Sequence, residues 1–147
     1  MSDEKGYITS KVFGEIVFDY GWKVKEPLKI ELFGKDYSVD IAAKAYYETE
    51  KITDEQETAF IELKKILEKR LKEAEKEIKE FYEEGCAEYY EGEFSKEELS
   101  EELTPKELLI QKDGECALLI TQESDLDNGL AVLLFPEVEV QTQDEYL

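Results

Sequence analysis

One stripe of apolar residues in the middle of this sequence sets the main limit on its fold. Between residues 53 and 85 the apolar side chains are spaced three and four apart, at Ala59, Phe60, Leu63, Ile66, Leu67, Leu71, Ala74, Ile78, Phe81 and Tyr82. That spacing follows the 3.6-residue period of an α-helix with one buried face. Thr53 with Gln56 predicts a capping box at the helix start, and Gly85 predicts its end. The chain therefore needs another element to cover this long amphipathic helix.

The length of this helix limits how it can pack. About 30 residues at 1.5 Å each make a rod of roughly 45 Å, which is longer than a domain of 147 residues is wide. We therefore expect the helix to protrude, to bend or to pack on a partner. No repeat or Pro/Gly/Ser-rich linker divides the chain, so we expect a single domain over residues 1–147.

The segments on both sides of the helix have the two-residue alternation of β-strands. Before the helix, residues 28–32 and 37–41 flank a turn that contains Gly34, which predicts a hairpin. After it, residues 108–110 and 116–120 flank Asp113-Gly114, which predicts a second hairpin.

The remaining segments complete the outline. Ser95 with Glu98 predicts a second capping box and a short helix from Lys96 to about Glu102. Residues 122–128 are expected to be a polar loop, followed by a strand that ends at Pro136 and by a last edge strand around Val138 and Val140. The expected fold class is α+β: an antiparallel β-sheet from N- and C-terminal strands, packed against one long central helix plus a short helix.

The charge balance limits the partners of this chain. Its 38 acidic and 18 basic residues give a formal net charge of -20. Nucleic acids and anionic membrane surfaces would be repelled, because a phosphate-binding protein needs a Lys/Arg surface. A basic protein partner is electrostatically favoured, although such a charge also serves ordinary solubility. The sequence shows neither a signal peptide nor 18 consecutive apolar residues, so we expect a cytoplasmic protein.

The excess of acidic over basic residues is greatest at the C-terminal end of the sequence. No Lys or Arg follows Lys112, whereas nine acidic residues do: Asp113, Glu115, Glu123, Asp125, Asp127, Glu137, Glu139, Asp144 and Glu145. If these strands share a sheet, one part of the surface carries a field of one sign, which steers a cationic partner. The predicted partner-binding residues are Glu123, Asp125, Asp127, Glu137 and Glu139, together with Tyr89 and Tyr90.

The tyrosines have two interpretations. In the first, they form an exposed aromatic patch for a protein partner. In the second, they lie at the rim of the core with solvated hydroxyl groups. The residues concerned are Tyr46, Tyr47, Tyr82, Tyr89 and Tyr90. The second interpretation is the simpler one.

The sequence offers little for catalysis. Histidine is absent, which removes the Ser-His-Asp and Cys-His nucleophile pairs. Cys86 and Cys116 are 30 residues apart and form no CxxC motif, so no zinc or redox pair is predicted. The cluster from Glu123 to Gly129 resembles a calcium loop but fails the EF-hand spacing, and a solvated turn explains it more simply. We therefore predict no cofactor and no bound metal.

Three short motifs carry a family resemblance. They are Thr53-Asp54-Glu55-Gln56, Leu103-Thr104-Pro105-Lys106-Glu107 and Asp127-Asn128-Gly129-Leu130-Ala131-Val132 followed by Gln143-Asp144. Together they resemble a bacterial family described as domain of unknown function 6985, with its related 2004 group. In that family the third motif usually reads Glu-His-Gly-Leu, and this chain lacks the histidine. The resemblance implies a cytoplasmic bacterial protein and no particular activity; immunity proteins of toxin systems are a weaker analogy.

Three hypotheses about function follow. The first is a non-enzymatic protein that binds a basic partner, such as an immunity protein of a toxin system. The second is an enzyme that depends on carboxylates or a divalent metal, which rests on the Glu123 to Asp127 cluster alone. The third is a self-associating structural domain, a homodimer in which the long helix packs on its twin.

Overall fold

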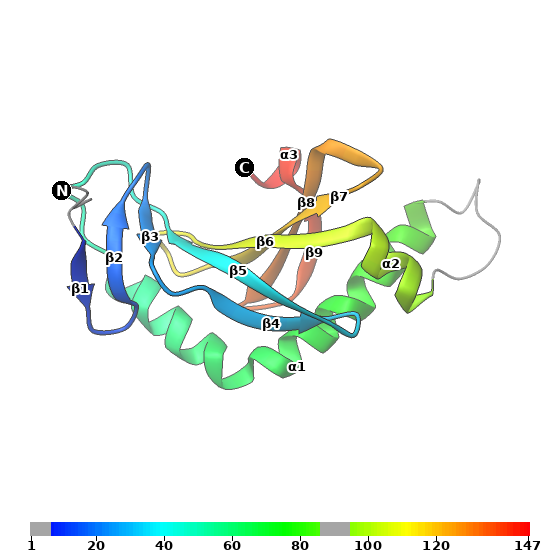
Figure 1. Ribbon diagram of the computed structural model, residues 1–147, viewed down its shortest axis with the longest axis horizontal. Helices are drawn as coiled ribbons and strands as arrows, with labels where there is room; N and C mark the ends of the chain where they lie inside the picture. Colours follow the sequence, from blue (N-terminus) through cyan, green and yellow to red (C-terminus); the bar gives the residue numbers. More distant parts are fainter. Residues whose placement is uncertain (1–6, 86–94) are drawn as a thin grey trace.

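The computed structural model describes residues 7–85 and 95–147, in which a mostly antiparallel sheet is packed against a long helix (Figure 1). The predicted α+β class is confirmed. The elements are β1 (Ile8–Ser10), β2 (Gly14–Phe18), β3 (Trp22–Val24), β4 (Leu28–Leu32), β5 (Lys35–Ala43), α1 (Asp54–Gly85), α2 (Lys96–Glu102), β6 (Leu103–Ile110), β7 (Cys116–Gln122), β8 (Asp125–Phe135), β9 (Glu139–Thr142) and α3 (Gln143–Tyr146). No helix in these two described ranges is long and apolar enough to cross a membrane.

The sheet joins the two ends of the chain through one parallel pair of strands. The nine strands of the described residues follow the order β1-β2-β3-β5-β6-β7-β8-β9, and β4 pairs with β5 alone. Strands β5 and β6 run parallel, with Asp40 opposite Glu107 and Ala43 opposite Ile110. Because parallel neighbours need a long crossover, α1 and α2 lie in the connection between them. The other pairs are antiparallel, and β9 lies at the edge as predicted.

Both predicted hairpins are confirmed. Strands β4 and β5 meet at the turn Phe33-Gly34, where φ is 50° and 80°. Two consecutive positive φ values suit a tight hairpin turn, because they match the twist of the strands. Strands β6 and β7 meet around Asp113-Gly114, and the N–H of Gly114 donates to the carbonyl of Gln111 at 2.9 Å.

The polar loop expected over residues 122–128 is wrong. Strand β7 extends to Gln122, β8 begins at Asp125, and these two residues are paired across a two-residue turn. The prediction failed because residues 123–127 are exposed and contain one apolar residue, Leu126, so the repeated apolar positions that mark a half-buried strand are missing.

The start of α1 is fixed to the sheet by Gln56. The predicted capping box is confirmed: the N–H of Gln56 donates to Thr53 Oγ1 at 3.0 Å, and the N–H of Thr53 donates to Gln56 Oε1 at 2.9 Å. Gln56 is completely buried. Its Nε2 also donates to the carbonyls of Lys44 and Ile110, each at 3.0 Å. These carbonyls lie where the parallel strands β5 and β6 end, so one amide joins the helix to both halves of the sheet.

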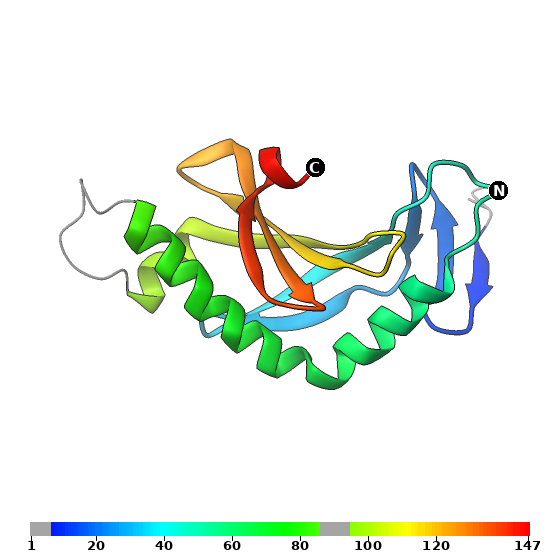
Figure 2. The ribbon, with the colours of Figure 1, turned by 180° about the vertical axis from the view of Figure 1, so that it is seen from behind.

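The long helix bends instead of protruding as a straight rod. Its backbone leaves the helical conformation at Ile66, where φ is -122° and ψ is 16°. Both views show the two halves of α1 meeting at an angle beneath the sheet (Figures 1 and 2). Leu63 before the bend and Leu71, Ala74 and Ile78 after it are buried in the core of the same chain. The buried part of the apolar stripe is therefore covered within the chain.

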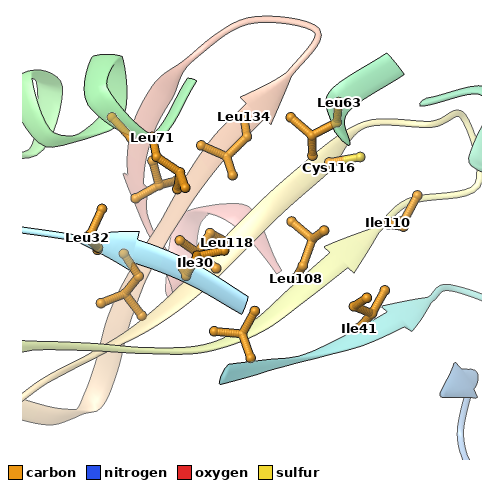
Figure 3. Close-up of a cluster of buried hydrophobic side chains, with 14 of the residues drawn as sticks. Ile30, Leu32, Ile41, Leu63, Leu71, Leu108, Ile110, Cys116, Leu118 and Leu134 are labelled. Atoms are coloured by element: carbon orange, nitrogen blue, oxygen red, sulfur yellow. The ribbon is translucent and has the colours of Figure 1, made fainter. Parts of the chain in front are cut away.

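The core lies between α1 and the sheet. Figure 3 shows Leu63 and Leu71 of α1 facing Ile30 of β4, Leu118 of β7 and Leu134 of β8. Ile30 is 5% exposed and the other four are 3% exposed or less. Each such side chain contributes about 1.5–3 kcal/mol when it leaves water, so strands distant in sequence are stabilised against one helix.

Glu50 fixes the segment between β5 and α1. Its Oε1 accepts from the N–H groups of Tyr46, at 2.6 Å, and Tyr47, at 3.0 Å, and its other oxygen pairs with Lys112. Its carbonyl accepts from Trp22 Nε1 at 2.6 Å. The hydrogen bond from Lys112, followed by that from the Tyr46 N–H, holds the pKa of Glu50 below its usual value.

The Gln56→Leu substitution tests the first of these anchors. It leaves the carbonyls of Lys44 and Ile110 without their side-chain donor in a site that water does not reach. We expect the free energy of unfolding to fall by about 2–4 kcal/mol, measured by urea denaturation. Thr58→Ala, at an exposed position of the same helix, is the control and should cost less than about 0.5 kcal/mol. A loss for Gln56→Leu no greater than for the control would contradict the anchoring role.

The Glu50→Gln substitution tests the second anchor through its pH dependence. Because the pKa of Glu50 is lowered on folding, its contribution is present above the usual carboxyl pKa of 4.5 and disappears as the pH falls through the folded value. The variant should therefore be less stable than the parent protein at neutral pH. This difference should shrink as the pH falls below 4.5, as followed by thermal unfolding across the range. Glu48→Gln, at an exposed neighbouring position, is the control and should change the stability at neutral pH by less than about 0.5 kcal/mol.

Candidate functional site

The turn between β7 and β8 brings acidic side chains together at one end of the sheet. We call this region the acidic tip and define it as Glu102, Glu123, Asp125, Leu126 and Asp127. In both views the turn projects at the top of the molecule, on the side opposite the bend of α1 (Figures 1 and 2). Glu123, Asp125 and Asp127 are exposed. Three of the predicted partner-binding residues therefore lie together.

Glu102 at the end of α2 holds the turn in place. The N–H of Glu123 donates to the carbonyl of Glu102 at 2.8 Å. The Glu102 carboxylate accepts from the N–H of Ser124, at 3.2 and 3.3 Å to its two oxygens, and from the Ser124 hydroxyl. Because these bonds order the turn before any partner arrives, less conformational entropy is lost on binding.

Leu126 adds an apolar group to this charged turn. Its side chain is 69% exposed, although it lies between two aspartates in strand β8. Since successive strand residues point to opposite faces, Leu126 lies on one face of the ribbon and Asp125 and Asp127 on the other. Neither Leu126 nor Glu102 was among the partner-binding residues predicted from the sequence. An apolar residue inside a polar run was the available signal for Leu126.

The other predicted partner-binding residues lie elsewhere. Glu139 pairs with Leu133 in the β8–β9 ladder. Leu133 is six residues from Asp127, or about 20 Å at 3.3 Å per residue. Glu137 is exposed just before β9, so the strand β8 separates these two acidic residues from the tip. Tyr89 and Tyr90 lie outside the described residues.

The tyrosines that the structure describes do not form one patch. Tyr46 and Tyr47 are 65% and 69% exposed. Lys112 Nζ lies 4.3 Å from the centre of the Tyr46 ring. Tyr82 is buried at the far end of α1, where its hydroxyl donates to Gln122 Oε1. Tyr82 therefore fits neither interpretation in full, because its side chain lies in the core and its hydroxyl is bonded to protein instead of water.

The motif around Asn128 ties the C-terminal helix to the sheet. Asn128 Oδ1 accepts from the N–H of Asp144 at 3.1 Å, and its carbonyl accepts from Gln122 Nε2 at 2.7 Å. Gln143 Nε2 donates to the carbonyls of Ile120 and Leu130, at 3.3 and 3.2 Å. The residues that resembled a calcium loop therefore form strand and capping contacts.

Two further observations concern metal binding and the reactivity of the buried cysteine. Within residues 7–85 and 95–147, no three His, Cys, Asp or Glu side chains are grouped so that they could hold a metal ion. Cys116 is a buried free thiol, and this burial raises its pKa to about 12. A thiol with so high a pKa is protonated at neutral pH and is a poor nucleophile.

Comparison with known proteins identifies the family. The sequence profile of a domain of unknown function, DUF6985, matches residues 12–144. The chain belongs to the DUF6985 family. Searches of the curated proteins and of the solved structures find no match. The acidic tip and the Asn128 contacts both lie within the DUF6985 range, and the family description names no activity.

The Gly129→Ala substitution tests the packing of the Asn128 motif. A Cβ at Gly129 would lie 2.2 Å from the carbonyl oxygen of Ile120 and 2.6 Å from Gln143 Nε2. We expect a loss of about 3 kcal/mol in the free energy of unfolding. Gly14→Ala is the control, because that site has a φ of 78° but no atom within 4 Å, and it should cost about 1 kcal/mol. Equal losses in urea denaturation would show that crowding at Gly129 is unimportant.

Proposed function

We propose that this DUF6985 chain is a non-enzymatic domain that binds a basic protein, and that the acidic tip is its contact surface. The observation that carries the proposal is a pre-ordered turn that presents three exposed carboxylates and one exposed leucine. A partner that encloses the projecting turn contacts both faces of the ribbon, with Asp125 and Asp127 on one face and Leu126 on the other. In protein interfaces a buried apolar group supplies contact area and the charges select the partner.

The charge of the whole chain supports this proposal. A net charge of -20 attracts a basic protein at distances up to the Debye length, which is about 8 Å at physiological ionic strength. Within that distance the carboxylates of Glu123, Asp125 and Asp127 orient the partner. Leu126 then supplies contact area that does not depend on salt.

An immunity protein of a toxin system is the specific form of this proposal. Toxins that act on nucleic acids have basic active sites, since they bind phosphates. A projecting acidic hairpin has the charge to occupy such a site. The proposal places the protein in the bacterial cytoplasm, where a buried free thiol such as Cys116 stays reduced.

The test compares two variants that remove the same charge from different places. A tagged chain is used to recover its partner from the native host, and the affinity of the purified pair is then measured by calorimetry. The tip variant carries Glu123→Gln, Asp125→Asn and Asp127→Asn. The control variant carries Glu48→Gln, Glu137→Gln and Glu139→Gln. We expect the tip variant to bind about 10–100 times more weakly, and the control to change less than about threefold.

Salt and the apolar anchor provide two further checks. The dissociation constant should rise with ionic strength in the parent protein and less steeply in the tip variant. Leu126→Ser should weaken binding without changing the salt dependence. Recovery of an acidic partner, or of none, would contradict the proposal. Equal losses of affinity in the tip and control variants would show that binding depends on the net charge of the protein and not on the acidic tip.

A further inference from the structure

A groove lined by lysines is positively charged, in contrast to the acidic tip. It has a volume of about 580 Å³ and lies between the C-terminal half of α1, the β4–β5 turn and α2. Phe33 of the turn and Leu99 of α2 supply its apolar lining, and both are largely buried. The amino groups around it come from Lys72, Lys76, Lys79 and Lys96.

The groove is positively charged, although the chain as a whole is strongly negative. Acidic residues outnumber basic ones by 38 to 18 in the sequence. Among the described residues that line the groove, however, Glu75 is the single carboxylate. Its Oε2 accepts from the N–H of Phe33 at 3.0 Å. Lys79 pairs with Glu83 at 3.9 Å. Lys72, Lys76 and Lys96 form no ion pair with any residue in the described ranges.

The fold brings these lysines together from two helices. Lys72, Lys76 and Lys79 are four and three residues apart, so they lie along one side of α1. Lys96 is the first residue of α2, and its Cε would lie 3.7 Å from a Cβ at Gly34. The Lys96 side chain therefore extends past the β4–β5 turn. Like charges so placed repel one another, and a bound anion would relieve that repulsion.

A second groove of about 710 Å³ continues from this one along β4, β5 and α1, and the two share Lys72 and Glu75. Its lining carries Glu31, Asp36 and Glu68 beside its lysines. Carboxylates there would repel an anion, so the cationic character is confined to the groove beside α2.

We propose that the lysine-lined groove binds a small organic anion, with a phosphate or carboxylate group among the lysines and an apolar part against Phe33 and Leu99. The volume lies in the range of small-molecule sites, about 300–1,000 Å³. Lysine amino groups bind phosphate as point charges, without the fixed geometry of arginine. A long polyanion such as a nucleic acid is disfavoured, because most of its length would face a protein of charge -20. This inference is independent of the acidic tip.

Nuclear magnetic resonance can test the site with defined probes. The ¹⁵N-labelled full chain is titrated at low salt with phenyl phosphate, with benzoate and with uncharged benzyl alcohol. We expect the two anions to shift the amide signals of residues 33–34, 72–79 and 96–99, and benzyl alcohol to shift them far less. Comparing the two anions distinguishes a phosphate from a carboxylate ligand.

Variants locate the binding to these lysines. The groove variant carries Lys72→Gln, Lys76→Gln and Lys96→Gln, and the control carries Lys64→Gln, Lys65→Gln and Lys106→Gln, all at exposed positions. We expect about tenfold weaker binding in the groove variant and less than a twofold change in the control. Shifts spread over all lysines, or equal losses in both variants, would overturn the proposal. So would saturation by a poly-glutamate peptide with no response to either small anion.

Discussion

The side-chain amide of Gln56 is the interaction on which the arrangement of this domain depends. The parallel pair β5–β6 is the one place where the N-terminal and C-terminal strands of the described chain meet. Gln56 closes the end of that pair by donating to a carbonyl from each side, while its own oxygen caps α1. Because the side chain is fully buried, water cannot replace these bonds. The direction of α1, and so the position of everything packed on it, follows from this contact.

Local patterns predicted much of the fold. Both capping boxes, both hairpins and the two main helices follow from interactions between residues a few positions apart, such as Ser95 with Glu98. The parallel seam could not be predicted in this way, since Asp40 and Glu107 are far apart in the sequence and no local signal pairs them. Gln56 shows the same limit. Its spacing from Thr53 revealed the cap, but its bonds to Lys44 and Ile110 depend on the assembled sheet.

The candidate sites were harder to predict, because charged residues that are close in the sequence can be far apart in the folded protein, and the reverse. The acidic residues of the last 35 positions are separated along β8, with Asp127 near the start of that strand and Glu139 paired with Leu133 near its end. The lysines show the opposite effect. Lys76 and Lys96 look unremarkable among the many acidic residues of the sequence, yet the packing of α2 near α1 places both on one groove. In each case tertiary structure decided which charges act together.

The two surfaces respond differently to the charge of the whole protein. A basic partner that approaches the acidic tip is attracted at every distance, so salt lowers both its association rate and its affinity. An anion that approaches the lysine-lined groove is first repelled by the net charge of -20 and is attracted only near Lys72, Lys76 and Lys96. Moderate salt screens the distant repulsion more than the close contacts, because screening grows with separation. A compact ligand is therefore favoured in the groove. Once bound, a small anion lies beside the lysines alone, whereas a longer one would extend over acidic surface that repels it.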